Sequence, residues 1–516
     1  MQNKQAWILI ISLAVIKLII PYIGIHPDFE LQRDEYLYLS YAQHMDWGYM
    51  EAPPLMAVFS WLSLQLGNSM SIVRFWPAFF GALTIIIIGK TVLQLGGKIF
   101  AVGIACMSFL VAGYLRMGIL FQPNFLEVFC WTWSCYFLVL LIQTNEPKYF
   151  YWLAFSFGIG FLAKYSALFF LISVLAAAIV TPQRKWFRSR HLYYSILLAL
   201  VIVAPNLWWQ YQHKFPVLYH MKLLKEQQLE KQDSMEFIIN QFLMTLPCFF
   251  VWIAGLWHVF FTKAGKQYQL FGWAFIGLII LLLMLHGKPY YTVGIYPVLF
   301  ALGAIQFQKI TEKLSLKWLR FALPVVMTAI CIPIIPVSLP IWKPENLRAY
   351  YLKNGFDKTG ILKWEERDDN ALPQDFADML GWREITEKTA KVYNALPDSA
   401  RLKTFIYCRN YGQAGSINYF AKQYNLSTTA YSDDASFLFW MPEKYDVENL
   451  ILVGSRMPGA DDAVFQQFET VTIMDSVTNP LSRQYGNKII LFEHAKPGTN
   501  EMIANGIKED KSKFYR

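Results

Sequence analysis

Residues 7–25 of the 516-residue chain read WILIISLAVIKLIIPYIGI, and the acidic stretch Arg33-Asp34-Glu35-Tyr36 follows soon after this run. The run is close to the roughly 20 residues that a helix needs to cross a bilayer. Asp34 and Glu35 are therefore expected at a membrane face, where ionisable groups are costly and by default indicate function. The alternative is that these loop carboxylates are merely solvated.

The composition extends the membrane interpretation to most of the chain. Hydrophobic residues make up 55% and charged residues 16%, with a mean hydropathy of +0.30, whereas soluble domains carry about 25% charged residues. The apolar residues form separate blocks of spanning length, so a soluble core does not explain them. We predict about eleven transmembrane helices, at residues 7–25, 72–95, 99–115, 125–143, 149–163, 166–180, 192–209, 237–260, 270–285, 291–307 and 321–339. The two short blocks on either side of Lys164 are either one broken helix or two tilted helices.

The distribution of positive charge predicts the orientation. The net charge is +9, and basic residues cluster in short loops such as 184–190 and 309–320. This is the positive-inside pattern of a membrane protein and does not indicate nucleic-acid binding. It places the N-terminus in the cytoplasm and the first loop, residues 26–71, outside. Five of the six cysteines lie in apolar blocks, so no disulfide framework or metal-spaced pair is predicted.

The composition changes after Pro340. Charged residues become frequent and no later run is long enough to span a membrane. We predict a membrane domain at 1–340 and an extracytoplasmic α/β domain at 341–516. The expected strands are 403–408, 437–440, 450–453, 470–474 and 488–492, and the expected helices are 374–394 and 413–424.

Four groups of chemistry-bearing residues are expected to converge on the outer face: Asp34 with Glu35, Glu51, Lys164 with Tyr165, and Lys288-Pro289-Tyr290-Tyr291. A carboxylate can take a proton from an acceptor hydroxyl, and a lysine can stabilise a departing phosphate, so the set suits group transfer from a phosphate-bearing donor. The alternative for the lysines is that they only extend to the interface. His213 ends an aromatic stretch, where it is either an interfacial residue or a ligand of a metal or phosphate.

Several ordered motifs carry a family resemblance: Asp34-Glu35-x-x-Tyr38, Glu51-x-Pro53-Pro54-Leu55, Leu162-Ala163-Lys164-Tyr165, Pro205-Asn206-Leu207-Trp208-Trp209, Lys288-Pro289-Tyr290-Tyr291 with Tyr296-Pro297, and Asn410-Tyr411-Gly412-Gln413-Ala414-Gly415. With these motifs the chain resembles the GT-C glycosyltransferases of the bacterial protein O-mannosyltransferase-like branch (glycosyltransferase family 39). That branch includes the lipid A aminoarabinose transferases.

The resemblance implies a multi-pass enzyme of the inner (plasma) membrane. It would move a hexosyl or pentosyl group, with inversion, from a polyprenyl-phosphate carrier to a protein, lipid or glycan outside. It implies Asp34 as the base or acceptor-orienting acid and Glu51 as a second catalytic acid, with Glu35 as the structural neighbour of Asp34. The residues expected to line the substrate site are Glu35, Lys164, Tyr165, His213, Lys288, Tyr290 and Tyr291. A divalent cation is possible, and membrane lipid but no nucleic acid is the expected partner.

Two departures from the family leave the acceptor and any metal open. Ala52 stands where the aminoarabinose transferases have a lysine, and Gln122-Pro123-Asn124-Phe125-Leu126 stands where relatives often have Thr-Asp-x-Pro-Leu. Glu127 is not expected to replace the missing acid, because it begins a lipid-embedded helix. A membrane transporter or lipid flippase is the alternative function, although the chain has neither the internal repeats nor the deep charge pairs typical of transporters. A membrane-anchored scaffold is a third.

Overall fold

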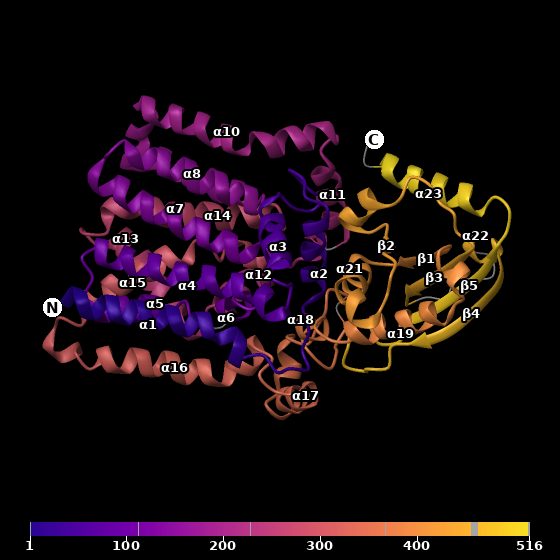
Figure 1. Ribbon diagram of the computed structural model, residues 1–516. Coiled ribbons are helices and arrows are strands. Elements are labelled where there is room, and N and C mark those ends of the chain that lie inside the picture. The colour runs from indigo at the N-terminus through magenta and orange to yellow at the C-terminus, as the bar shows by residue number, and fades with distance from the viewer. Residues whose placement is uncertain (1, 112, 228, 367, 456–462, 514–516) are drawn as a thin grey trace.

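The computed structural model describes residues 2–111, 113–227, 229–366, 368–455 and 463–513. Its long helices lie side by side in one bundle, and an α/β part lies at one end of that bundle (Figure 1). The N-terminus lies at the far end. The short helices α2 (Arg33–Ser40), α3 (Leu55–Gln65) and α11 (Pro216–Gln227) lie at the end that faces the α/β part. The loops that we predicted on one side of the membrane are therefore gathered at one end.

Six helices among the described residues are long and apolar enough to cross a membrane. Four of them are α1 (Gln2–Ile23), α4 (Met70–Gln94), α7 (Asn124–Thr144) and α10 (Arg190–Gln212). The other two are Lys266–Met284, which includes α14 (Gln269–Met284), and Leu314–Ser338, which includes α16 (Leu319–Ser338). Two bent pairs raise this number to eight if each is one span. They are α9 (Ala167–Val180) with Pro182–Arg188, bent by 105°, and α12 (Ser234–Leu243) with Leu246–Phe261, bent by 64°. The count of eleven spans stays a prediction.

The structure corrects three of the predicted elements in this region. The range 99–115 is not one span, because α5 (Ile99–Met107) is followed by the separate α6 (Gly113–Met117), and the amide of Gly113 bonds to the carbonyl oxygen of Met244 (3.1 Å). The range 237–260 bends ahead of α13 (Phe249–Phe261), where Pro247 interrupts the helical hydrogen bonds. The range 210–236, where we predicted no helix, contains α11.

The blocks flanking Lys164 form two separate helices, α8 (Lys148–Ala163) and α9. α8 packs beside α7 and α10, whereas α9 packs beside α14. At the centre of the bundle α13 packs against the buried α15 (Tyr296–Ile310). A Cβ on Gly303 would lie 1.8 Å from the carbonyl oxygen of Val251, so glycine permits this close approach.

The C-terminal part contains a five-stranded mixed sheet in the order β2-β1-β3-β5-β4. The strands are β1 (Thr404–Cys408), β2 (Ala430–Ser432), β3 (Asn449–Gly454), β4 (Phe468–Ser476) and β5 (Lys488–Ala495). β1 pairs parallel with β2 and β3, and β5 pairs antiparallel with β3 and β4. The predicted strand at 437–440 is wrong, because Ala435–Trp440 forms the 3₁₀ helix η10.

Alternate strand residues face the two sides of this sheet, as the two-residue period of a strand requires. Ile406, Ile451 and Leu491 belong to the same buried cluster as Trp382, whereas Leu452 and Ile490 belong to another. The helices of this part are α17 (Pro344–Lys353), α18 (Gln374–Ala377), α19 (Trp382–Ala395), α20 (Asp398–Arg401), α21 (Tyr411–Phe420), α22 (Ala463–Gln466) and α23 (Thr499–Lys513). The predicted helix 374–394 is broken between α18 and α19 at Gly381, whose φ is +88°.

Candidate active site

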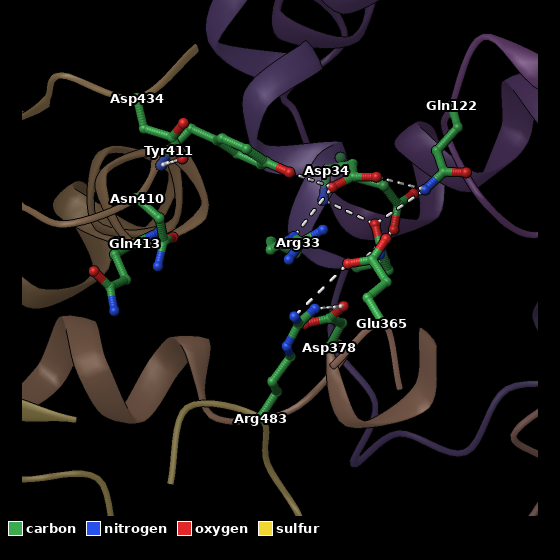
Figure 2. Close-up of polar contacts among 12 residues, drawn as sticks. Arg33, Asp34, Gln122, Glu365, Asp378, Asn410, Tyr411, Gln413, Asp434 and Arg483 are labelled. Atoms are coloured by element: carbon green, nitrogen blue, oxygen red, sulfur yellow. Dashed lines mark hydrogen bonds and ion pairs between the residues drawn. The ribbon is translucent and has the colours of Figure 1, made fainter. Parts of the chain in front are cut away.

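Asp34 lies in the first turn of α2, and three side chains donate to its carboxylate. The hydroxyl of Tyr411 lies 2.7 Å and Nε of Arg33 3.2 Å from Oδ1, and Nε2 of Gln122 lies 3.3 Å from Oδ2 (Figure 2). The Asp34 side chain is still 28% exposed. The carboxylate is thus fixed in orientation and remains accessible to a ligand.

Tyr411 reaches Asp34 because two glycines let α21 lie against α2. Asn410 caps α21 by accepting from the amide of Gln413 (3.0 Å). A Cβ on Gly415 would lie 2.8 Å from the carbonyl oxygen of Tyr36, and one on Gly412 would lie 2.6 Å from Cγ of Arg33. The 410–415 motif therefore serves to bring the C-terminal part to the carboxylate.

Both carboxylate oxygens of Glu35 accept hydrogen bonds from backbone amides. Oε2 accepts from the amide of Gln32 (2.6 Å) in a capping box, and Oε1 accepts from the amide of Phe121 (2.7 Å). Burial raises its pKa to about 7, although both amides favour the ionised form. We predicted Glu35 in the substrate site, but these contacts place it behind Asp34, where it joins α2 to the start of α7.

Glu51 is held by one hydroxyl from the first loop and one from the C-terminal part. Its Oε1 accepts from the hydroxyl of Tyr41, and its Oε2 accepts from Oγ of Ser436 (2.8 Å). Burial raises the pKa of Glu51 to about 7. Burial also raises the pKa of Tyr38, and the charges of Asp34 and Glu51 raise it further. Tyr38 is therefore a common neighbour of the two predicted catalytic acids.

Lys164 is the C-cap of α8 and pairs with Glu127. Its Nζ lies 2.9 Å from Oε2 of Glu127 and donates to Oδ1 of Asn124 (2.7 Å), and it lies over the rings of Tyr290 and Tyr291. Glu127 is only 1% exposed and also accepts from Oγ of Ser166. The amide of Asn124 continues the chain of hydrogen bonds to Gln122 (3.3 Å), which donates to Asp34.

Lys288 belongs to a second charged network. Its Nζ lies 3.4 Å from Oε1 of Glu365, whose other oxygen lies 3.8 Å from Arg483. Arg483 also contacts the buried carboxylate of Asp378 at 3.2 Å. Burial raises the pKa of Asp378 to about 6, while Arg33 and Arg483 lower it. Arg33 therefore stands between this network and Asp34, as Figure 2 shows.

The structure does not bring every predicted site residue to Asp34. The hydroxyl of Tyr165 bonds to Oδ1 of Asn206 (3.3 Å) and accepts from Nε2 of Gln210 (2.9 Å). His213 stacks on Trp209 at 4.1 Å and lines a separate cavity. No cluster of three or more His, Cys, Asp or Glu side chains that could hold a metal occurs among the described residues.

Comparisons with known proteins agree with the resemblance. A family model described as dolichyl-phosphate-mannose-protein mannosyltransferase matches residues 51–209. Lipid A galacturonosyltransferase RgtD of Rhizobium johnstonii is 23% identical over 241 residues, which are 45% of this chain and 50% of that protein. The chain thus matches about half the length of this relative.

Two solved structures of ArnT from Cupriavidus metallidurans resemble the chain over nearly its whole length. The one bound to undecaprenyl phosphate has a TM-score of 0.58, and the apo one has a TM-score of 0.60. Each is 13% identical and covers 94% of this chain and 97% of ArnT. The chain therefore has the fold of these ArnT structures. It is a multi-pass membrane protein of the GT-C type.

Several residues around the candidate site were not predicted from the sequence. Tyr411 was noted as part of a motif but not as a partner of Asp34. No motif in the sequence around Ser436, Glu365 or Arg483 indicated a role in the site. Glu127 was set aside as lipid-embedded, yet the structure buries it against Lys164.

We expect Tyr411→Phe to lower kcat about tenfold, because one hydrogen bond to a charged group contributes about 1.5–3 kcal/mol and orients Asp34. The measurement is the initial rate of sugar transfer at saturating donor. Tyr485→Phe, which alters an exposed tyrosine of the same part, is the matched control. An unchanged rate for Tyr411→Phe would show that Asp34 does not need this partner.

The raised pKa of Glu51 predicts a pH-dependent stability. The carboxyl group releases its proton near pH 4.5 in the unfolded chain and near pH 7 in the folded chain. The folded state therefore binds more protons in this interval, and the free energy of unfolding falls as pH rises through it. We expect Glu51→Gln to flatten the fall in Tm between about pH 5 and about pH 8, and Glu345→Gln, at an exposed site, to leave it unchanged. An unaltered slope in Glu51→Gln would contradict the assignment.

Proposed function

We propose that this chain is a glycosyltransferase that moves a sugar from a polyprenyl-phosphate carrier to an acceptor at the outer face of the membrane, with inversion. One observation carries the proposal. The oriented and accessible carboxylate of Asp34 connects through Gln122 and Asn124 to the ammonium of Lys164. A group that can take a proton and a group that can stabilise an anion therefore share one site.

The proposed reaction begins with an acceptor hydroxyl that donates to Asp34. As its oxygen attacks the anomeric carbon opposite the carrier phosphate, the bond from that carbon to the phosphate oxygen breaks. The hydroxyl proton passes to Asp34, and the bond electrons leave with the phosphate. The hydroxyl of Tyr411 and the guanidinium of Arg33 hold the carboxylate in place throughout. Attack from the opposite face inverts the anomeric centre.

The two lysines differ in their freedom to meet the phosphate. Lys164 is bound to Glu127, which is buried and has no other charged partner among the described residues. Lys288 is bound to Glu365, which also contacts Arg483. If Lys288 moved to a phosphate, Glu365 would still have Arg483 as a positively charged partner. We therefore assign Lys288 to direct contact with the carrier phosphate and Lys164 to a fixed positive charge nearby.

Lys288→Ala should raise the KM for the lipid-linked donor about tenfold or more, because a charge-assisted hydrogen bond to phosphate contributes about 1.5–3 kcal/mol. The kcat should change less, since the carboxylate and the fixed charge of Lys164 remain. Lys343→Ala, at an exposed site, is the control. An unchanged KM would remove Lys288 from the phosphate site.

The decisive test incubates the purified protein in nanodiscs with a panel of polyprenyl-phosphate sugars and an envelope extract as acceptor. We expect one lipid-linked sugar to be consumed, free polyprenyl phosphate to appear, and Asp34→Asn to release none. If no donor is consumed but vesicles containing the wild-type protein and the variant move the lipid across the bilayer equally, the flippase alternative replaces the proposal.

A further inference from the structure

A second cavity lies beside the site, where the bundle meets the C-terminal part. Its volume is about 270 Å³, and its lining includes His44, Asp46, Trp209, His213, Trp440 and Lys511. These residues come from the segment after α2, the end of α10, η10 and the C-terminal helix α23. The end of α10 and α23 lie on the same side of the molecule in Figure 1.

Aromatic rings in stacked pairs build the walls of this cavity. His44 stacks on Trp440 with centroids 4.1 Å apart and an interplanar angle of 8°, and Trp209 stacks on His213 at 4.1 Å. A Cβ on Gly48 would lie 2.4 Å from the ring of Trp209, so glycine there lets the loop close on the indole. Both pairs contribute aromatic surface to the lining of the cavity.

The polar groups of the cavity are mixed in charge. Asp46 brings a carboxylate and Lys511 an ammonium, and the two imidazoles add hydrogen-bonding nitrogens. A lone phosphate would meet the carboxylate, and an acyl chain would offer no hydrogen bonds to the carboxylate and the ammonium. A sugar ring satisfies both requirements, because its C–H faces pack on aromatic rings while its hydroxyls donate to and accept from charged and imidazole groups.

The segments that line the cavity are the same segments that hold Glu51. Gly48 and Tyr49 line it, and Glu51 follows two residues later. Trp440 lies in η10 with Ser436, which donates to Glu51. The ring of Tyr49 also stacks at 3.7 Å on Tyr41, the other donor to Glu51. A ligand in the cavity therefore lies one layer of side chains away from a predicted catalytic acid.

We propose that this cavity binds a saccharide ring of the acceptor and so selects glycan-bearing acceptors. This inference rests on the proposed function, because it gives the acceptor a place on the Glu51 side of the site. The carrier phosphate is assigned to Lys288, which pairs with Glu365 and does not line this cavity. The two substrates are thus assigned to different groups of side chains.

The test is saturation-transfer NMR on the full-length protein in nanodiscs, with chitobiose, maltose and mannobiose as probes. We expect ring protons of at least one probe to receive saturation, and Trp440→Ala and Asp46→Asn each to weaken that binding about tenfold. Asp46 is exposed, so its variant tests the cavity without a packing defect. Trp342→Ala, at a remote exposed tryptophan, is the matched control and should bind as wild type does.

Several results would overturn the inference. One is that no probe binds, another is that the cavity variants bind as the control does, and a third is that inorganic phosphate displaces the sugar. Asp34→Asn should bind the probe normally, since Asp34 does not line the cavity. A protein without transfer activity can thus still pass this test. Conversely, the protein could transfer sugar while the Trp440 and Asp46 variants bind the probe as the wild type does. That result would contradict the cavity assignment and leave the proposed function intact.

Discussion

Asp34→Asn should lower kcat for sugar transfer by about 10²–10⁴-fold, the usual contribution of a general base. The amide has nearly the same shape and can still accept from Tyr411, so the fold of α2 and the contact with α21 should persist. It cannot take the proton of the acceptor hydroxyl. The measurement is single-turnover transfer from the lipid-linked donor identified by the panel, together with donor binding.

The control for this variant is Asp28→Asn. Asp28 lies in the same external segment, but its side chain is 49% exposed and pairs only with His26 among the described residues, at 3.5 Å. It should transfer sugar at the wild-type rate. Transfer at the wild-type rate by Asp34→Asn would end the assignment of Asp34 as base. Loss of donor binding in that variant would instead indicate a structural role.

Candidate site residues in loops could be proposed from the sequence, because the positive-inside pattern assigns loops to one side of the membrane without any knowledge of packing. Asp34, Glu51 and Lys164 are expected at one face, and the charges of Asp34 and Glu51 both raise the pKa of Tyr38. Their partners from the C-terminal part could not be predicted from the sequence. Tyr411 and Ser436 are 377 and 385 residues away from the acids they contact. Nothing in a local pattern predicts which distant helix will pack there.

The errors in secondary structure have local causes. The apolar run 437–440 could be a strand or a helical turn, and short apolar runs do not distinguish the two. Ala435, with a φ of +53°, begins the 3₁₀ turn instead. The bend at Pro247 follows from the missing amide of proline and could have been predicted from the sequence. The end of α5 could not, because Gly113 bonds to Met244, a residue that only the fold brings near.

Glu127 shows how one local break changes the interpretation of a charge. In a continuous helix from 149 to 180, Lys164 would have lain inside a span, and Glu127 would have faced lipid without a partner. The chain instead leaves the helix at Lys164, whose φ of −161° is extended. Its ammonium then reaches the first turn of α7, so a buried ion pair forms between two helices. The sequence already allowed a break at Lys164, but only the structure shows that Glu127 is the partner of this lysine.

Lys164→Ala should therefore be the most destabilising of the single substitutions considered. Removal of one partner from a buried ion pair costs about 3–5 kcal/mol, because the other charge stays buried without compensation. Among the described residues, Glu127 would keep only Ser166 as a side-chain donor. We expect a marked fall in the thermal midpoint of the protein in nanodiscs. The thermal midpoint of Lys288→Ala should fall much less, because Glu365 is 32% exposed and keeps its contact with Arg483.

The double variant Lys164→Met with Glu127→Gln separates stability from function. It removes both charges while it retains most of the volume, and such replacements of buried pairs are often neutral for stability. We expect its thermal midpoint to return close to that of the wild type. Transfer should stay impaired, because the fixed positive charge beside the proposed phosphate site is gone. Wild-type transfer by a stable double variant would show that the pair serves only to join α7 to the break after α8.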